Sequence, residues 1–237
     1  RIQLEYNTFV ELEKRKATIL KTIEEQSQLT PELKSKIENT FDPTELEDIY
    51  LPYKPKKRTK ASIAKEKGLE PLAKIIMSQF ERNLNEKANR FVTDQVADAE
   101  EALAGARDIV AEWISENIRA RNLVRFHYKR DALIVSKVAK GKEADGHKYQ
   151  DYFAWSELVK RCPSHRYLAM KRGENEGILK ISLDVDTDQI LSKLNQQFVK
   201  GHTPCGEQVE MAIKDSFKRL LAPSIETELF NEFKAKA

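Results

Sequence analysis

The sequence contains few cysteines and no long apolar run, and each shortage excludes a class of protein. Two cysteines in 237 residues, Cys162 and Cys205, cannot staple a disulfide-rich scaffold, and they predict a reducing, cytoplasmic compartment. No apolar stretch approaches the roughly 20 residues that span a membrane. The first five residues form no signal-peptide core. Because the sequence begins with Arg1 and ends in a helical pattern, we expect it to be cut from a longer protein.

Motifs that carry catalysis are also missing. There is no glycine-rich phosphate loop, no GxSxG elbow and no HExxH pair. Asp184, Asp186 and Asp188 have a spacing that resembles a cation site, but the glycine and the downstream glutamate of a calcium loop do not accompany them. Capping of a helix explains Asp186 better. We therefore expect that the chain is not an enzyme and has no cofactor.

Two short pairs of possible zinc ligands need separate treatment. Cys162 with His165, and His202 with Cys205, give four nitrogen and sulfur ligands in two close pairs, which is the pattern of a structural zinc site. The alternative is that both pairs cap or pack against the helices predicted beside them. We favour caps and core and expect no metal, although zinc at these four residues stays open as the alternative.

Charge is abundant but balanced. The chain has 41 basic and 38 acidic residues, a net charge of +3, which neither predicts nor excludes a nucleic-acid partner. Charged residues make up 33% of the chain, above the roughly 25% of an average soluble domain. Such an excess is typical of long helices with exposed charged faces, so only local clusters of one sign can indicate binding.

Helical periodicity dominates the sequence. Apolar residues recur at helical spacing over 1–26 and over 97–120, and the second pattern continues to about residue 130. Capping residues followed by proline begin further helices at Thr30 and Asp42. These patterns predict a mainly α fold.

More helices are indicated in the remaining sequence. Thr59 and Asp186 are predicted N-caps, the latter with Gln189 at the third helical position. A helix over 164–172 is expected to end at Gly173. Two helices, near 187–199 and 205–236, finish the chain.

Only one segment alternates as a β-strand should. Apolar and polar residues alternate over 178–185, and the short apolar run at 132–138 is the obvious partner, because a single half-buried strand cannot stand alone. The predicted fold is therefore mainly α and multi-helical, with helix-turn-helix-like hairpins and one small two-stranded β element. The predicted regions are an N-terminal helical region with a basic connector over 1–94 and a central helical region with the β element over 95–237.

Two basic clusters could contact nucleic acid. The first, within 54–67, holds seven lysines and arginines against Glu66 alone. The second, within 119–130, contains no acidic residue and is interleaved with Phe126, His127 and Tyr128. Such clusters can bind phosphates, because binding releases counterions from the nucleic acid, and aromatic rings can stack on unpaired bases. The candidate contacts are Lys56, Lys57, Arg58, Lys60, Arg119, Arg121 and Arg125.

The alternative to nucleic-acid binding is that both clusters are solvent-exposed faces or ion-pair partners of acidic side chains, as most charge runs are. A helix-turn-helix at 59–80 could also suit DNA. However, its second helix begins Glu70-Pro71-Leu72 and offers no Arg, Asn or Gln to base edges, so an ordinary packed hairpin is favoured.

Several motifs closely resemble the Tex family of bacterial transcription accessory proteins. They are LEDIYLPYKPKKRT at 46–59, ASIA at 61–64, KGLEPLA at 67–73, PSHR at 163–166 with LA and RGE just after it, and KRLLAPSIE at 218–226. The motifs are long, specific and in the family's order, so the resemblance covers nearly the whole chain.

The resemblance implies a cytoplasmic protein that binds nucleic acid and acts in transcription. Tex proteins have a helical N-terminal half with helix-turn-helix-like elements, followed by a ribonuclease-H-like domain, helix-hairpin-helix modules and an S1 domain. Their RNA and DNA binding rests chiefly on the S1 domain, and from the resemblance we expect this chain to end before all three. We therefore expect a non-catalytic scaffold and interaction region, with nucleic acid, and RNA polymerase or other transcription components, as partners of the larger assembly. The alternative is a direct, weak and sequence-independent DNA- or RNA-binding module that uses the two basic clusters.

Overall fold

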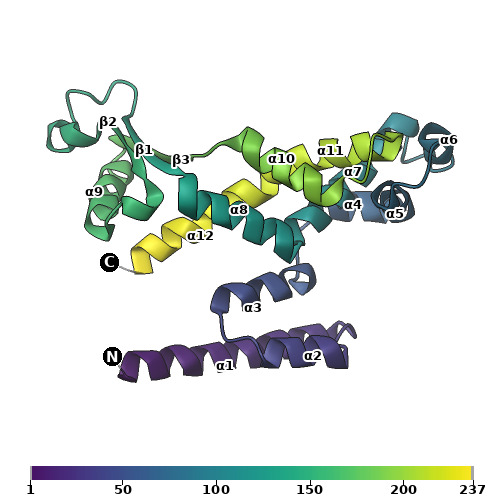
Figure 1. Ribbon diagram of the computed structural model, residues 1–237, viewed down its shortest axis with the longest axis horizontal. Coiled ribbons are helices and arrows are strands. Elements are labelled where there is room, and N and C mark those ends of the chain that lie inside the picture. Colours follow the sequence, from purple (N-terminus) through teal and green to yellow (C-terminus); the bar gives the residue numbers. More distant parts are fainter. Residues whose placement is uncertain (1, 236–237) are drawn as a thin grey trace.

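The computed structural model describes the backbone of residues 2–235 and the side chains of residues 6–235. Within that range the chain forms twelve α-helices and a three-stranded antiparallel sheet, so the prediction of a mainly α fold is confirmed. Figure 1 shows an elongated body with the sheet at one end and α4, α5 and α6 at the other, and with α1, α2 and α3 beneath it.

The first three helices make a unit with its own buried cluster. They are α1 (Ile2–Glu25), α2 (Pro31–Glu38) and α3 (Pro43–Tyr50). Thr30 and Asp42 cap α2 and α3 as predicted, each followed by proline at the first helical position. The buried residues that hold the unit together are Leu12, Ile19, Ile23, Ile37, Leu46, Ile49 and Tyr50.

The connector leads from this unit into the body. A short 3₁₀ turn (Leu51–Tyr53) precedes it, and the side-chain amide of Gln26 donates to the carbonyl of Tyr53 at 2.8 Å. Thr59 then caps α4 and forms a capping box with Ser62. The next helices are α4 (Lys60–Glu66), α5 (Glu70–Ser78) and α6 (Leu84–Asn89).

The hairpin of α4 and α5 turns at Gly68, whose φ of 77° is left-handed. The inner faces of both helices are buried, through Ala61 and Ala64 on α4 and Leu72 and Ile76 on α5. Both helices pack against α7. The hairpin is therefore part of the main core.

The predicted helix over 97–130 is broken at Asn117. Two helices result, α7 (Ala99–Glu116) and α8 (Ile118–Asp131). Asn117 has extended backbone angles and accepts hydrogen bonds from the backbone amides of Arg119 and Ala120. Asn favours capping positions over helix interiors, which is why the helix is interrupted at this residue. The apolar spacing continues across Asn117, so the sequence pattern did not reveal the change of direction.

The sheet has the order β2-β1-β3. β1 (Leu133–Val138) pairs antiparallel with β3 (Leu179–Asp184), which confirms the predicted pairing, with Leu133 opposite Asp184. The prediction of only two strands was wrong, because β2 (Ala154–Leu158) adds to the other edge of β1. The missed strand is short, and its sequence, AWSEL, does not alternate apolar with polar residues, which explains why no period-two pattern marked it.

Helices surround the sheet and close the body. α9 (Ser164–Asn175) packs on β3 and runs past Gly173, which lies inside the helix. The predicted helix end at Gly173 was therefore wrong: a Cβ at that position would come within 2.6 Å of Leu179 Cδ1, so this glycine permits close packing. The glycine with left-handed backbone angles near the end of α9 is Gly177, whose φ is 73°.

The last three helices are α10 (Thr187–Phe198), α11 (Pro204–Ser216) and α12 (Ala222–Ala235). Asp186 caps α10 by accepting from the amide of Gln189, as predicted. A π-helical turn, Phe217–Leu221, joins α11 to α12. Pro223, which has no backbone N–H to donate, lies two residues after this turn.

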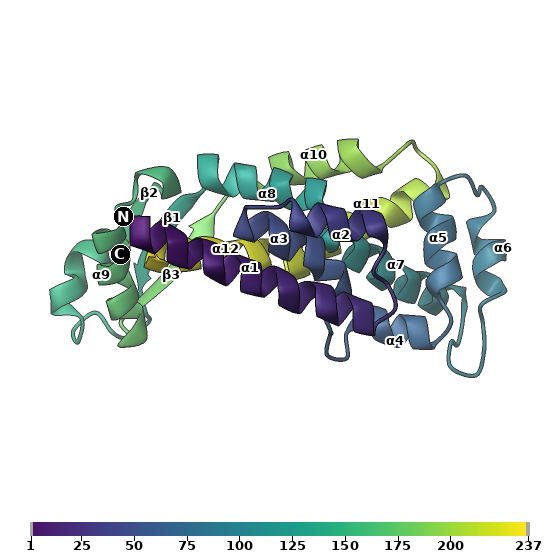
Figure 2. The same cartoon turned by 90° about the horizontal axis from the view of Figure 1, so that it is seen from below.

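The main core is one continuous cluster that runs from Ala61 to Phe233. Seen from below in Figure 2, α1 lies across this body. The buried clusters thus divide between α3 and α4, inside the predicted region 1–94. The boundary predicted near residue 94 stays a prediction.

Candidate nucleic-acid interface

Three lysines of the first basic cluster are held by acidic side chains of α7. Lys56 and Lys65 contact Glu112 at 3.0 and 3.3 Å, and Lys56 also bonds Glu116. Lys67 pairs with Glu101 at 2.8 Å. These lysines fasten the connector and α4 to α7.

Two opposing effects, burial and ion pairing, determine the pKa values in this cluster. Burial alone would raise the pKa of Glu112, but hydrogen bonds and charges from Lys56 and Lys65 outweigh it and lower that pKa. For Glu116, burial outweighs the hydrogen bond from Lys56 and raises its pKa. Burial would lower the pKa of Lys56, yet its bonds to both carboxylates raise it. Lys56 is therefore a charged structural contact.

The second cluster is divided by the direction in which its side chains point. Arg121 and Arg125 of α8 lie buried, with 6% and 9% of their surfaces exposed. Arg121 donates from Nε to Asp48 of α3 at 2.6 Å, and Arg125 donates from Nη2 to Asp48 at 2.9 Å and to Glu228 of α12 at 3.0 Å. A phosphate could reach these guanidiniums only by displacing a carboxylate.

Further polar groups complete this buried ion network. Arg121 also donates to the hydroxyl of Ser224 at 3.2 Å, and Arg125 to the amide oxygen of Asn122 at 2.6 Å. Burial would lower the pKa of Arg125, but Glu228 and Asp48 raise it, so its charge is fixed. We call Asp48, Arg121, Arg125 and Glu228 the joint, because they tie α3 to α8 and α12.

The residues that make up the joint were partly missed from the sequence. The two arginines were proposed as phosphate contacts, whereas Asp48 and Glu228 were not singled out. Asp48 lies in the motif at 46–59 and Ser224 in the motif at 218–226. The structure brings these distant motifs together on α8, which gives each of them a structural role.

The remaining candidate cations are exposed. In the part of the chain that the structure describes, Lys57, Arg58 and Arg119 make no ion pair, and Lys60 has only the longer-range attraction of Asp108. Lys56 bonds Glu116 at the end of α7, and Arg119 follows three residues later. Lys57 and Arg58 lie in the connector, Lys60 begins α4, and Arg119 lies in the first turn of α8. Whether they contact nucleic acid stays a prediction.

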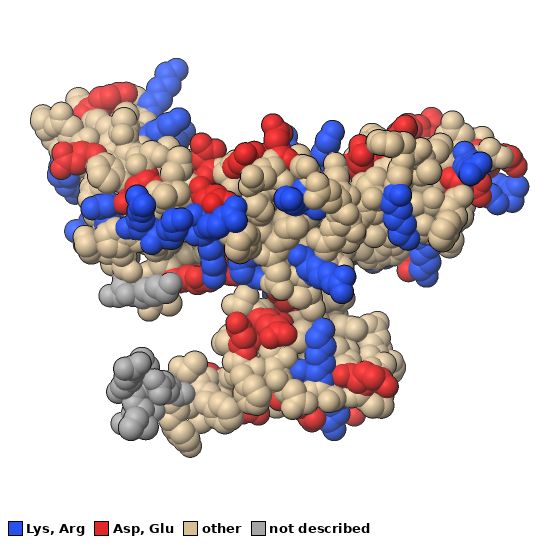
Figure 3. All heavy atoms as spheres, viewed as in Figure 1, with Lys and Arg blue, Asp and Glu red and all other residues tan. Residues whose placement is uncertain are grey.

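The rest of the surface mixes both signs of charge. Lys129 pairs with Glu232 at 2.6 Å and Arg130 with Asp131 at 2.6 Å, so two more cations of 119–130 are balanced. Figure 3 shows basic groups gathered over the region of α8 and α9, with acidic groups beside them. This face is therefore not a strongly positive surface.

The two possible zinc pairs lie at opposite ends of the body. Cys162 precedes α9 beside the sheet, and Cys205 begins α11, where its thiol donates to the carbonyl of Glu81 at 3.3 Å near α6 (Figure 1). Burial raises the pKa of Cys162 to about 12. Among the side chains that the structure describes, those of residues 6–235, no group of three or more His, Cys, Asp or Glu could hold a metal.

The fold and these sites define a multi-helical module with internal ion pairs and a few exposed basic residues. The sequence model of a protein family, described as Tex central region-like, matches residues 79–237. The chain therefore belongs to the Tex family. None of the helices in the described range is long and apolar enough to cross a membrane.

Individual relatives agree with this family. The chain is 44% identical over 178 residues to Transcriptional accessory protein Tex of Neisseria gonorrhoeae, covering 75% of this chain and 24% of that protein. It is 47% identical over 178 residues to Protein YhgF of Escherichia coli, covering 74% and 23%. It is 36% identical over 235 residues to Protein tex of Bordetella pertussis, covering 92% and 30%. The chain thus spans about a quarter to a third of these relatives.

Proposed function

We propose that this chain is a non-catalytic scaffold and interaction region of a cytoplasmic, Tex-like transcription accessory protein. It fixes helical elements relative to one another, and nucleic acid, with RNA polymerase or other transcription components, is the partner of the larger assembly. The name of the relative from Neisseria gonorrhoeae, Transcriptional accessory protein Tex, supports a role in transcription. The absence of catalytic motifs in the sequence supports a structural role.

The observation that carries this proposal is the joint. It uses two of the seven cations predicted to contact phosphate, Arg121 and Arg125, and pairs them with Asp48 and Glu228. Buried ion pairs with several hydrogen bonds hold one geometry, because each charge would be costly without its partner. The α1–α3 unit is therefore held at a fixed position on the body.

Hydrogen exchange tests the proposed scaffold role. Asp48→Ala should speed amide exchange in α3 and α8, where the joint is lost, while the sheet stays protected. Glu45→Ala removes an exposed glutamate of the same helix that is not part of the joint, so it is the matched control and should leave exchange unchanged. Equal protection in the Asp48 variant and the wild type would contradict a role for the joint in fixing the unit.

The second candidate function is direct, weak and sequence-independent binding of DNA or RNA. Four exposed cations favour it, since Lys57, Arg58, Lys60 and Arg119 are free to neutralise phosphates. The name of a relative also supports it: S1 RNA-binding domain-containing protein 1 of Homo sapiens. That protein is 26% identical to the chain over 212 residues, and the chain covers 21% of its length.

Single substitutions test this second candidate. Each lost phosphate contact should reduce the slope of log affinity against log salt by about one. Lys57→Ala or Arg58→Ala should therefore flatten the slope, whereas Lys137→Ala, an exposed lysine of β1, should not. A flattened slope in the Lys137 variant alone would show that the connector is not the binding surface.

A further inference from the structure

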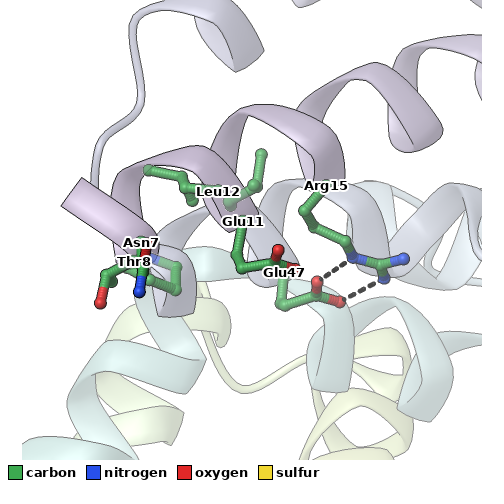
Figure 4. A pocket seen from close by; sticks show the side chains of 8 residues that line it. Asn7, Thr8, Glu11, Leu12, Arg15 and Glu47 are labelled. Carbon is green, nitrogen blue, oxygen red and sulfur yellow. Dashed lines mark hydrogen bonds and ion pairs between the residues drawn. The ribbon is translucent and has the colours of Figure 1, made fainter. Parts of the chain in front are cut away.

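The α1–α3 unit has the features of a separately folded part. Its buried cluster extends from Leu12 to Tyr50 and does not join the main core. Figure 4 shows Arg15 of α1 joined to Glu47 of α3 within the unit, through two hydrogen bonds of 2.6 and 2.9 Å. The connector that follows, 54–58, is exposed and lies outside any helix or strand. We therefore expect the unit to keep its own fold when its contacts with the body are lost.

The contact between the unit and the body is polar and incompletely packed. Ile118 of α8 packs on the unit's buried cluster, and the joint supplies the ion pairs beside it. A hollow of about 350 Å³ lies between α3 and α8. In the view of Figure 3 the unit meets the body over a narrow region. Parts of a chain that meet through a small polar interface usually move relative to one another.

The two walls of this hollow carry opposite charges. Asp42, Glu45 and Asp48 line the α3 side at a spacing of three residues, and Arg125 and Lys129 line the α8 side. Residues three or four apart lie on one face of a helix, so an acidic face of α3 covers a basic face of α8. Lys129 is already paired with Glu232 of α12. The cations that α3 neutralises are therefore the two arginines of the joint.

From these observations we infer that the α1–α3 unit is an autoinhibitory cover over a phosphate-binding face of α8. While the unit is docked, Asp48 bonds Arg121 and Arg125 in the place that a phosphate group would take. When a nucleic-acid phosphate displaces Asp48, the unit pivots on the connector, and α8 presents both arginines together with the exposed Arg119. The inference rests on the proposed nucleic-acid binding. The joint holds the closed state as long as no phosphate competes for it.

Fluorescence anisotropy with labelled DNA tests the inference on the whole chain. Asp48→Asn removes the covering charge, so it should tighten binding about tenfold at low salt. It should also steepen the slope of log affinity against log salt by about one for each arginine that reaches a phosphate. Adding Arg121→Gln to this variant should reverse part of the change. Glu32→Gln removes the same charge from α2, outside the hollow, so it is the matched control and should change neither quantity.

A chemical link shows whether the gain requires the unit to move. Glu45→Cys and Asn122→Cys place thiols on the two walls of the hollow, and the native cysteines are buried. A short bismaleimide that joins these thiols in the Asp48→Asn protein should abolish the gain, whereas the unlinked protein should keep it. A gain that survives linking would overturn the inference.

The wild type gives a second measurement that does not depend on the folding of a variant at the joint. Coupling between two binding events is reciprocal, so DNA that competes with Asp48 must favour the open state. Dyes on Glu32→Cys of α2 and Lys193→Cys of α10, both at exposed positions, report the separation of the unit from the body. Energy transfer between them should fall as DNA saturates the protein at low salt. Unchanged energy transfer would overturn the inference.

The inference and the proposed binding can fail separately. If the wild type binds DNA and Asp48→Asn strengthens binding no more than Glu32→Gln does, the cover is refuted and the proposed binding remains. Binding by Asp48→Asn alone would support the cover and show that the exposed cations do not bind by themselves. If neither protein binds at low salt, both the cover and the proposed binding are refuted.

Discussion

Asp48 of α3 accepts hydrogen bonds from two arginines of α8, Arg121 at 2.6 Å and Arg125 at 2.9 Å. The two arginines are one helical turn apart, so their guanidiniums converge on a single carboxylate. Glu228 of α12 supplies the second negative charge and balances the site. A basic helix whose sequence looks suited to phosphate thus serves as the support of the N-terminal unit.

Removing Asp48 should destabilise the protein strongly. Asp48→Ala leaves two buried cations with one carboxylate, and breaking a buried pair in this way costs about 3–5 kcal/mol. Chemical denaturation, followed by circular dichroism, measures the free energy of unfolding. Glu45→Ala, at an exposed glutamate of α3 outside the joint, is the control and should change it by less than about 0.5 kcal/mol. Similar small effects for both variants would show that the joint contributes little.

Glu226 should make stability depend on pH. Burial raises the pKa of this carboxyl above its usual 4.5, and the hydrogen bond from Tyr128, at 3.0 Å, offsets only part of the shift. The folded protein therefore holds this proton at higher pH than the unfolded chain does. The stability that the neutral carboxyl contributes is present below about pH 4.5 and is lost as the pH rises through the folded pKa.

The variant Glu226→Gln isolates this effect, because it keeps an oxygen for Tyr128 but cannot ionise. The free energy of unfolding of the variant minus that of the wild type should grow as the pH rises from about 4 to about 7. Denaturation curves at several pH values give this difference. A constant difference, or one that shrinks with rising pH, would show that Glu226 does not titrate in this way.

We predict that the purified chain contains no zinc. The thiols of Cys162 and Cys205 are buried, and burial raises both pKa values, whereas a zinc ligand must be a thiolate. Elemental analysis by mass spectrometry measures the metal content. Close to one equivalent of zinc, lost in Cys162→Ser or His202→Ala, would contradict this prediction.

Local features of the fold could be predicted from the sequence because the residues that decide them are neighbours. Thr30, Asp42, Thr59 and Asp186 cap the helices as expected, since a capping side chain bonds an amide two or three positions away. The pairing of β1 with β3 was also predictable from two apolar runs. By contrast, the sequence of β2 does not alternate apolar with polar residues, and nothing local marked it as a strand.

The candidate site depended on distant partners, and there the sequence was less informative. Arg121 lies 73 residues from Asp48, and Arg125 lies 103 residues from Glu228. Nothing within α8 indicates that these arginines turn inward while Arg119 stays exposed. The motifs at 46–59 and 218–226 contain Asp48 and Ser224, but a motif does not say which residues meet.

The central claim, a scaffold whose own nucleic-acid binding is weak, is tested most directly by fluorescence anisotropy. The chain is titrated into labelled RNA and DNA of two unrelated sequences, at about 50 and about 200 mM salt. We predict dissociation constants of about 10⁻⁴–10⁻⁶ M near physiological salt, equal for the two sequences and rising steeply with salt. Tight binding that distinguishes the two sequences would contradict the account.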